Sequence, residues 1–489
     1  MGDILSNKSS IDLLLLLFIV ERGMLMKRYI KLGILIILVL VTIILIIFRF
    51  SGTKKEENKG IVPKYKLAIS KEKEDVEKQI NIRVLITTDD FKDIFHSNVA
   101  FKCESDCKLL YNNNEKIIKA GKTVKINTDS KYLKKGTIKI VPMEENSKIQ
   151  LMSVERQYGN PKYSGSIELS LSNNKILVTN ELSIEKYLCG VVSSEMPYNY
   201  GETALMVQAI CARTYAYSQV LNESYKKYNA HVDDSVNYQV YNNVETTEET
   251  NKAVEKTRGI IITYEDKPIN ALFFSTSCGC TTLADIWGNK NFPYIKSVYL
   301  SDEKGIDLSK EENFDSFIRK QANTYDKEYS LYRWSVTMKA DELSYSVNNA
   351  LPTIKGVDRQ YIGEVVNIRV IKRGKGGIIK CIEIKGTEGC VEVELQGNIR
   401  KLFNISNSKL YNKDGEIVNG FSMLPSGYFI VDKVVKDGEL YFEFIGGGFG
   451  HGVGMSQNAT RTMAEKGMSY EEILNFFYKN IELQNMYEL

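Results

Sequence analysis

The stretch VVSSEMPYNYGETALMVQAICARTYA (Val191–Ala216) decides how the centre of this 489-residue chain folds. Its second half carries apolar and small residues at spacings of three and four, which is the period of an amphipathic helix. These residues are Ala204, Val207, Ile210, Cys211 and Thr214. The pattern predicts a helix that begins near Glu202, after the break that Met196-Pro197 imposes. Glu195 is therefore expected in the connection that leads into this helix.

Two interpretations of Glu195 stay open from spacing alone. Next to Met196-Pro197 and two tyrosines, its carboxyl can be partly desolvated, which raises its pKa and makes it a general acid at neutral pH. Alternatively, Glu195 caps the following helix or pairs with an arginine such as Arg213, because structural ion pairs also perturb carboxyl groups.

An apolar run, Leu32–Phe48, lies far upstream of this stretch. With its flanking Tyr29 and Phe50 it reaches the roughly 20 residues that span a bilayer, so it predicts a transmembrane helix over residues 29–50. Basic residues before it favour a cytoplasmic N-terminus, residues 1–28, of which the part before Met24 or Met26 could be an overrun of the start site. A cleaved signal peptide is the alternative, but no Ala-x-Ala-like cleavage site follows the run.

Beyond the predicted membrane helix, residues 51–79 are rich in lysine, glutamate and asparagine, which is typical of a solvated tether. Residues 80–152 contain short alternating runs such as INIRVLI and GTIKIVPM, separated by turn residues, and they predict a small β-rich module. Acidic and basic residues are equally numerous after Phe50, so charge gives no reason to expect a nucleic-acid partner.

Residues 153–489 mix helical and strand signals. Helices are predicted over TEETNKAVEKTRG, with Thr247 as N-cap, over EENFDSFIRKQA, and over SYEEILNFFYKN, which opens on a capping box. Strands such as VVNIRVIKR and LYFEFIG fill the region from Val365 to Phe444. The expected fold class is α+β, a β-rich N-terminal module followed by a mixed α+β domain with a few helices, behind the transmembrane helix.

The glycine-rich segment GGGFGHGVGMSQNATR (Gly446–Arg461) is a second candidate for chemistry. Its glycines can adopt turn conformations that other residues rarely adopt, and they allow the backbone to approach a ligand closely. His451 and Gln457 add polar groups. A phosphate-binding loop is a weak alternative, because the Gly-Lys-Ser/Thr ending and a following βαβ unit are missing. The structural alternative is a tight turn before a helix that begins near Ser456.

A third candidate is FFSTSCGCTTLADIWG (Phe273–Gly288), in which hydroxyl groups precede Trp287, a combination that often holds a sugar ring. Cys278 and Cys280 are too close for ordinary disulfide geometry and have no second pair for zinc.

Elsewhere, cysteines and histidines give weak signals. Cys381 and Cys390 flank a predicted hairpin and could pair across it. His96, Cys103 and Cys107 are scattered in a β region and are interpreted as structural rather than as metal ligands.

Taken in order, SSEMP…ALMVQAICARTYA, FFSTSCGCTT…W and GGGFGHGVGMSQNAT resemble the family of stage II sporulation protein D and the amidase enhancer LytB. The resemblance covers roughly residues 153–489. It implies a membrane-anchored lytic transglycosylase that faces the wall and cleaves peptidoglycan glycan strands, with Glu195 as the catalytic acid. A role in sporulation is a further hypothesis, and a non-enzymatic protein that binds the wall and enhances a partner amidase is the alternative.

Membership of the same motifs marks six residues as candidates for binding the glycan. They are Arg213, Tyr215, Ser275, Ser277, His451 and Gln457. Some family members carry a zinc site of histidine and cysteine after the helix, whereas the corresponding AHVDDSVNYQVY keeps His231 without cysteines, so neither a metal nor another cofactor is expected.

Overall fold

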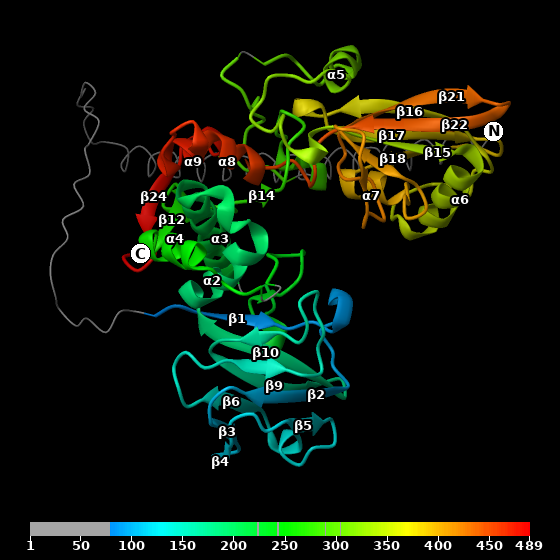
Figure 1. The fold of residues 1–489 in the computed structure, drawn as a ribbon. Helices are drawn as coiled ribbons and strands as arrows, with labels where there is room; N and C mark the ends of the chain where they lie inside the picture. Colours follow the sequence, from blue (N-terminus) through cyan, green and yellow to red (C-terminus); the bar gives the residue numbers. More distant parts are fainter. Residues whose placement is uncertain (1–78, 223, 242–243, 289, 304) are drawn as a thin grey trace, which may run out of the picture. The chain divides into compact units, whose positions relative to one another are not determined.

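The computed structural model describes residues 79–222, 224–241, 244–288, 290–303 and 305–489 (Figure 1). These residues form a mixed α+β structure, as predicted. The expected transmembrane helix over residues 29–50, together with residues 1–28 and the tether up to residue 78, lies outside the described residues. Within the described ranges, no helix combines the length and the apolar character needed to cross a membrane.

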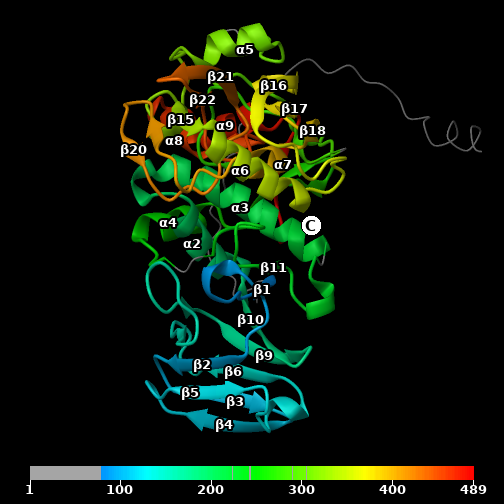
Figure 2. The same ribbon diagram turned by 90° about the vertical axis from the view of Figure 1, so that its right-hand side faces the viewer.

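Two mainly antiparallel sheets form the N-terminal part of the described chain (Figure 2). The larger has the strand order β11-β1-β10-β9-β6-β3-β4, and the smaller has the order β5-β2-β7-β8. The strands are β1 (Asn81–Leu85), β2 (Asn98–Cys103), β3 (Cys107–Tyr111), β4 (Asn114–Ile118), β5 (Val124–Asn127), β6 (Ile138–Pro142), β7 (Ile149–Leu151), β8 (Lys162–Tyr163), β9 (Ser166–Ser172), β10 (Lys175–Ser183) and β11 (Val232–Asp233). The larger sheet therefore continues across the boundary expected at residues 152–153.

Helix α2 (Ile184–Glu195) follows β10 directly, and the Oγ of its N-cap Ser183 accepts a hydrogen bond from the Lys186 N–H. The sequence did not predict this helix, because glycine, valine and serine in its second half have weak helix propensity. Helix α3 (Glu202–Asn222) begins where predicted, and α4 (Glu248–Lys256) has the predicted N-cap Thr247. Helix α2 packs on β1 and β10 of the larger sheet, α3 and α4 pack on α2, and all three share one hydrophobic core with the sheet.

Arg213 holds this group of helices together from inside. Its side chain is fully buried, and its Nε and Nη2 bind the two carboxylate oxygens of Glu185 in α2 at 2.9 and 2.8 Å. The guanidinium also donates to the carbonyls of Val254 in α4 and Ile260 at 3.0 and 3.2 Å. The alternative that Arg213 pairs with Glu195 is therefore wrong, because its carboxylate partner is Glu185.

Two further sheets share a second core with α6 (Ala340–Ala350) and α7 (Gln396–Lys401), two helices that the sequence did not predict. Their orders are β20-β19-β15-β22-β21 and β16-β17-β18. The strands are β15 (Trp334–Lys339), β16 (Val365–Arg373), β17 (Ile379–Gly386), β18 (Cys390–Glu394), β19 (Leu410–Asn412), β20 (Ile417–Val418), β21 (Phe429–Lys436) and β22 (Glu439–Gly446).

Cys381 and Cys390, which could have paired across the predicted hairpin, do not form a disulfide. In the β17–β18 register Cys381 lies opposite Glu394, whereas Cys390 lies opposite Lys385, so the two thiols are offset along the strands. Both are free cysteines.

The last part of the chain returns to the centre of the molecule. β14 (Phe273–Phe274) pairs in parallel with β23 (Met455–Ser456), and β12 (Ile260–Tyr264) pairs with β13 (Lys267–Pro268) and β24 (Glu482–Asn485). Helices α8 (Gln457–Glu465) and α9 (Tyr470–Phe477) contact α3 (Figure 1). Helix α9 has the predicted capping box, and the predicted EENFDSFIRKQA helix is α5 (Glu311–Ile318).

Arg213→Ala should lower the free energy of unfolding by about 3–5 kcal/mol, because Glu185 would stay buried without its cation. Arg319→Ala is the matched control, since Arg319 pairs with Asp315 and Asp432 at a partly exposed site, and such pairs contribute about 0–1 kcal/mol. Chemical denaturation of both variants measures the difference. Equal losses in the two variants would contradict this role of Arg213.

Candidate active site

A cavity of about 1010 Å³ lies where the three sequence motifs meet. Five of the seven predicted site residues line it, namely Glu195, Tyr215, Ser275, His451 and Gln457. Helix α3 presents Tyr215, Gln219 and Asn222, which follow each other at spacings of four and three and so share one helix face. An aromatic wall consists of Phe273, Phe274, Trp287, Phe292 and Phe449.

Glu195 is the last residue of α2, so the negative end of the helix dipole lies beside its carboxyl. Its Oε1 accepts a hydrogen bond from the Val240 N–H at 2.8 Å. Gln457 Nε2 lies 3.4 Å from Oε2 and 3.1 Å from the Glu195 carbonyl oxygen. Burial raises the pKa of Glu195, and the hydrogen bonds from Val240 and Gln457 offset only part of that rise. The interpretation of Glu195 as a desolvated acid fits this geometry.

Gln457 is itself held in place from α3. Its Nε2 also donates to Oε1 of the fully buried Gln208 at 3.3 Å. Gln208 lies in the predicted helix, where a glutamine within an apolar pattern was a signal that sequence reasoning missed. The hydrogen bond between Gln457 and Gln208 connects the first turn of α8 to α3 next to Glu195.

His451 lies in the aromatic wall, with ring centroids 5.6 Å from Phe274 and 5.2 Å from Trp287. Its Nδ1 accepts the Val453 N–H at 3.1 Å, which leaves the ring proton on Nε2. Burial lowers the pKa of His451 to about 4, and the charge of Arg400 acts in the same direction, whereas a backbone hydrogen bond at Phe273 opposes them. His451 is therefore a neutral hydrogen-bonding group at physiological pH rather than a proton source.

Tyr215 and Ser275 contribute a phenol and a hydroxyl to the cavity. Burial raises the pKa of Tyr215 to about 12, so the phenol keeps its proton and can donate it in a hydrogen bond. Ser275 Oγ lies 3.2 Å from Thr276 Oγ1, and the Ser275 carbonyl accepts the Asn458 N–H at 3.0 Å.

Two predicted binding residues do not line the cavity. Arg213 is committed to Glu185 in the helical core. Ser277 is fully buried, and its hydroxyl donates to the carboxyl of Asp326. Both predictions came from motif membership, which does not distinguish a residue that faces the ligand from one that supports the motif.

The cavity also contains two cations that sequence reasoning missed, Lys290 and Arg400. Arg400 lies on α7, and its Nε donates to the Leu424 carbonyl at 2.8 Å. Burial lowers the pKa of Arg400 to about 10, which still leaves it charged at neutral pH. Neither cation belongs to one of the three motifs, so no sequence signal connected them with Glu195.

The residues considered as metal ligands have structural contacts. His231 Nδ1 accepts the Arg83 N–H at 3.1 Å, and His96 Nε2 lies 2.8 Å from the Ile86 carbonyl. Cys103 and Cys107 are buried next to each other. Across the described parts of the chain, no group of three or more His, Cys, Asp or Glu side chains could hold a metal ion.

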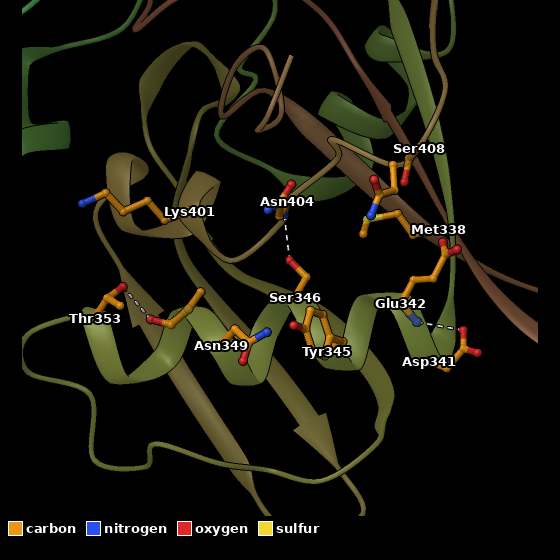
Figure 3. Close-up of a pocket in the computed structure, with 12 residues that line it drawn as sticks. Met338, Asp341, Glu342, Tyr345, Ser346, Asn349, Thr353, Lys401, Asn404 and Ser408 are labelled. Carbon is orange, nitrogen blue, oxygen red and sulfur yellow. Dashed lines mark hydrogen bonds between the residues drawn. The ribbon is translucent and has the colours of Figure 1, made fainter. Parts of the chain in front are cut away.

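A separate cavity of about 610 Å³ lies over α6 (Figure 3). Ser346 Oγ accepts the Asn404 N–H there at 2.7 Å, which ties α6 to the loop after α7. Its two carboxyl groups, Asp341 and Glu342, are exposed to solvent, so water solvates their charges. None of the three sequence motifs reaches this cavity, which makes the cavity at Glu195 the better candidate active site.

Comparison with known proteins agrees with the arrangement of the motifs. A family model described as stage II sporulation protein matches residues 172–264, and a domain of unknown function matches residues 281–414 and 407–454. Stage II sporulation protein D of Bacillus amyloliquefaciens is 27% identical over 318 residues, which cover 62% of this chain and 74% of that protein. The amidase enhancer of Bacillus subtilis is 26% identical over 315 residues, which cover 60% of this chain and 40% of that protein.

These similarities relate the chain to proteins with roles in sporulation and at the cell wall. An uncharacterised protein of Brachyspira hyodysenteriae is 28% identical to this chain over 325 residues, which cover 66% of this chain and 72% of that protein. The match at residues 172–264 and these relatives confirm the resemblance of its motifs to the family of stage II sporulation protein D and the amidase enhancer.

His451 should remain neutral down to about pH 4, and NMR of ring nitrogens in ¹⁵N-histidine-labelled protein, assigned with His451→Gln, measures this. The unfolded chain takes up a proton at this histidine near pH 6.5 and the folded chain only near pH 4, so stability should fall as the pH drops through that window. His451→Gln should lose this part of the pH dependence. A ring that titrates near pH 6.5 in the folded protein would contradict the assignment.

Proposed function

We propose that the protein is a lytic transglycosylase that cleaves peptidoglycan glycan strands, with Glu195 as its catalytic acid and base. The observation that carries the proposal is that Glu195 is the one carboxyl among the described residues that line the large cavity, and that its pKa is raised. Glycoside hydrolases of the common kinds need two carboxyl groups across the scissile bond. A single carboxyl is enough when the substrate supplies the nucleophile.

In the proposed reaction, protonated Glu195 donates its proton to the oxygen between MurNAc C1 and GlcNAc C4 as the C1–O bond breaks. The resulting carboxylate then takes the proton of the MurNAc 6-hydroxyl, whose oxygen forms a bond to C1 and closes the 1,6-anhydro ring. One bond to C1 breaks and one forms, and the proton returns to Glu195, so the enzyme ends in its starting state.

The surroundings of Glu195 support both halves of this cycle. Burial favours the protonated acid of the first half. The Val240 N–H and the Gln457 amide can stabilise the carboxylate of the second half. The aromatic wall with Trp287 offers faces on which sugar rings can stack, while neutral His451 and protonated Tyr215 offer hydrogen bonds.

The similarity to an amidase enhancer favours a second candidate function. In that case the same cavity binds glycan, Glu195 performs no bond chemistry, and the protein stimulates a partner cell-wall amidase. The two functions differ in whether the isolated protein forms new chain ends.

The apolar run at residues 29–50 would anchor the protein in the cell membrane by a single helix, with the cavity on the wall side, and the family's name motivates a role in sporulation. Both are further parts of the proposal. Expression confined to vegetative growth would argue against the sporulation role.

Glu195→Gln should lower the rate of cleavage by about 10²–10⁴-fold, the usual contribution of a general acid or base, while glycan binding persists. Full-length protein is incubated with peptidoglycan stripped of stem peptides, and 1,6-anhydro-MurNAc ends are quantified by mass spectrometry. Glu342→Gln, at the separate cavity over α6, is the matched control and should leave cleavage unchanged.

Other products would change the conclusion. Reducing ends in place of anhydro ends would indicate hydrolysis and a second carboxyl. No cleavage by the wild type, with glycan binding intact in both proteins, would favour the amidase-enhancer function.

A further inference from the structure

Asp326 is a fully buried carboxyl that the proposed reaction does not use. It lies between α5 and β15, in a segment outside the three motifs. Its Oδ2 accepts the Ser277 N–H at 3.3 Å and the Ser277 hydroxyl. The Ser456 hydroxyl lies 3.0 and 3.2 Å from its two oxygens. One side chain therefore joins the second motif to the third.

All of these donors are neutral, and no lysine, arginine or histidine among the described residues forms an ion pair with Asp326. Burial raises the pKa of Asp326 to about 7, although the hydrogen bonds from Ser277 and Ser456 oppose the rise. A buried carboxyl without a cation is costly, and an apolar side chain of similar volume would avoid that cost. The hydrogen bonds that Asp326 accepts connect segments of the site in return for this cost.

These hydrogen bonds lead to Glu195 in two steps. Ser456 is the N-cap of α8, so holding its hydroxyl holds the first turn of that helix. The next residue, Gln457, donates from Nε2 to the carbonyl oxygen and the carboxyl of Glu195.

The same first turn is held from the second motif. Asn458 Nδ2 donates to Thr276 Oγ1 at 2.7 Å, and its backbone N–H donates to the Ser275 carbonyl. Asp326 binds Ser277, which follows Thr276 in the second motif, and Ser456, which lies two residues before Asn458 in the third.

The geometry points to Asp326 as a positioning residue that fixes the first turn of α8 and thereby keeps the Gln457 amide against Glu195. The effect on rate rests on the proposed function, whereas the effect on the ionisation of Glu195 does not. A carboxyl suits this task because its two oxygens can accept several donors from different segments at once. An asparagine at this position would turn an NH₂ group towards one of the serine hydroxyls.

The two ionisable groups closest to Asp326 keep one charge state near neutral pH. Cys278 and Tyr200 lie close to Asp326, and burial raises the pKa of both, that of Cys278 to about 12. The other ionisable residues that line the cavity with Glu195 are Tyr215, Tyr238, Lys290, Arg400 and His451. A titration of Glu195 can therefore be followed without a charge change at Cys278 or Tyr215.

The test compares full-length wild type with Asp326→Asn, Gln457→Ala and the double variant. The ionisation of Glu195 is followed by ¹³C NMR of protein labelled at the glutamate carboxyl carbon, and Glu195→Gln assigns its signal. The Gln457 hydrogen bond lowers the pKa of Glu195, so losing that bond should move the titration to higher pH. Asp326→Asn should cause such a shift and lower kcat roughly tenfold with little change in KM.

The double variant should match Gln457→Ala alone, because Asp326 acts through Gln457. An unchanged Glu195 titration in Asp326→Asn, or additive shifts in the double variant, would overturn the inference. If the titration shifts as expected but the wild type forms no anhydro ends, the positioning role stands and the proposed function fails. If Asp326→Asn does not fold, Ser456→Ala replaces it, and an unshifted titration in that variant would also overturn the inference.

Discussion

The parallel pairing of Phe273–Phe274 with Met455–Ser456 is the constraint on which the site depends. It brings together two motifs that are far apart in the sequence and places the first turn of α8 beside the end of α2. The approach is close enough to require glycine at specific positions. A Cβ at Gly454, where φ is +79°, would lie 2.0 Å from the Leu272 carbonyl oxygen, and a Cβ at Gly448 would lie 2.9 Å from that of Thr276. Glycines in this segment are therefore needed for the close packing of its backbone against the second motif.

Two glutamates of α2 show how the surroundings decide the role of a carboxyl. Glu185 forms an ion pair with the buried guanidinium of Arg213 through both of its carboxylate oxygens. At the other end of the same helix, the Glu195 carboxyl accepts hydrogen bonds from neutral groups of Val240 and Gln457, and the negative end of the helix dipole lies beside it. Because Arg213 is paired with Glu185, no lysine or arginine within the described part of the chain forms an ion pair with Glu195. The helical core therefore favours the acid form of Glu195, because it pairs Arg213 with Glu185 instead.

Hairpins, capping boxes and helix α3 could be predicted because their signals are local, such as the Ser469–Glu472 box or the alternation in β1. The helix period also contained unused information. Successive residues turn by about 100°, so Arg213 and Tyr215 are about 200° apart and cannot both face one cavity. The roles of Ser277 and Asp326 could not be predicted, because they depend on a contact between segments 49 residues apart. Helix α2 was missed because its packing against the sheet, rather than its propensity, stabilises it.

The Met-Pro sequence after Glu195 explains how one amide can control this residue. A residue before proline favours extended backbone, and Met196 adopts φ −137° and ψ 130°, so the helix ends at Glu195. The last carbonyls of a helix have no partner within it. The Glu195 carbonyl finds its partner in Gln457 Nε2, which also reaches the carboxyl of the same residue. Because backbone and side chain of Glu195 share one donor, a displacement of α8 would disturb the position of the acid and its ionisation together.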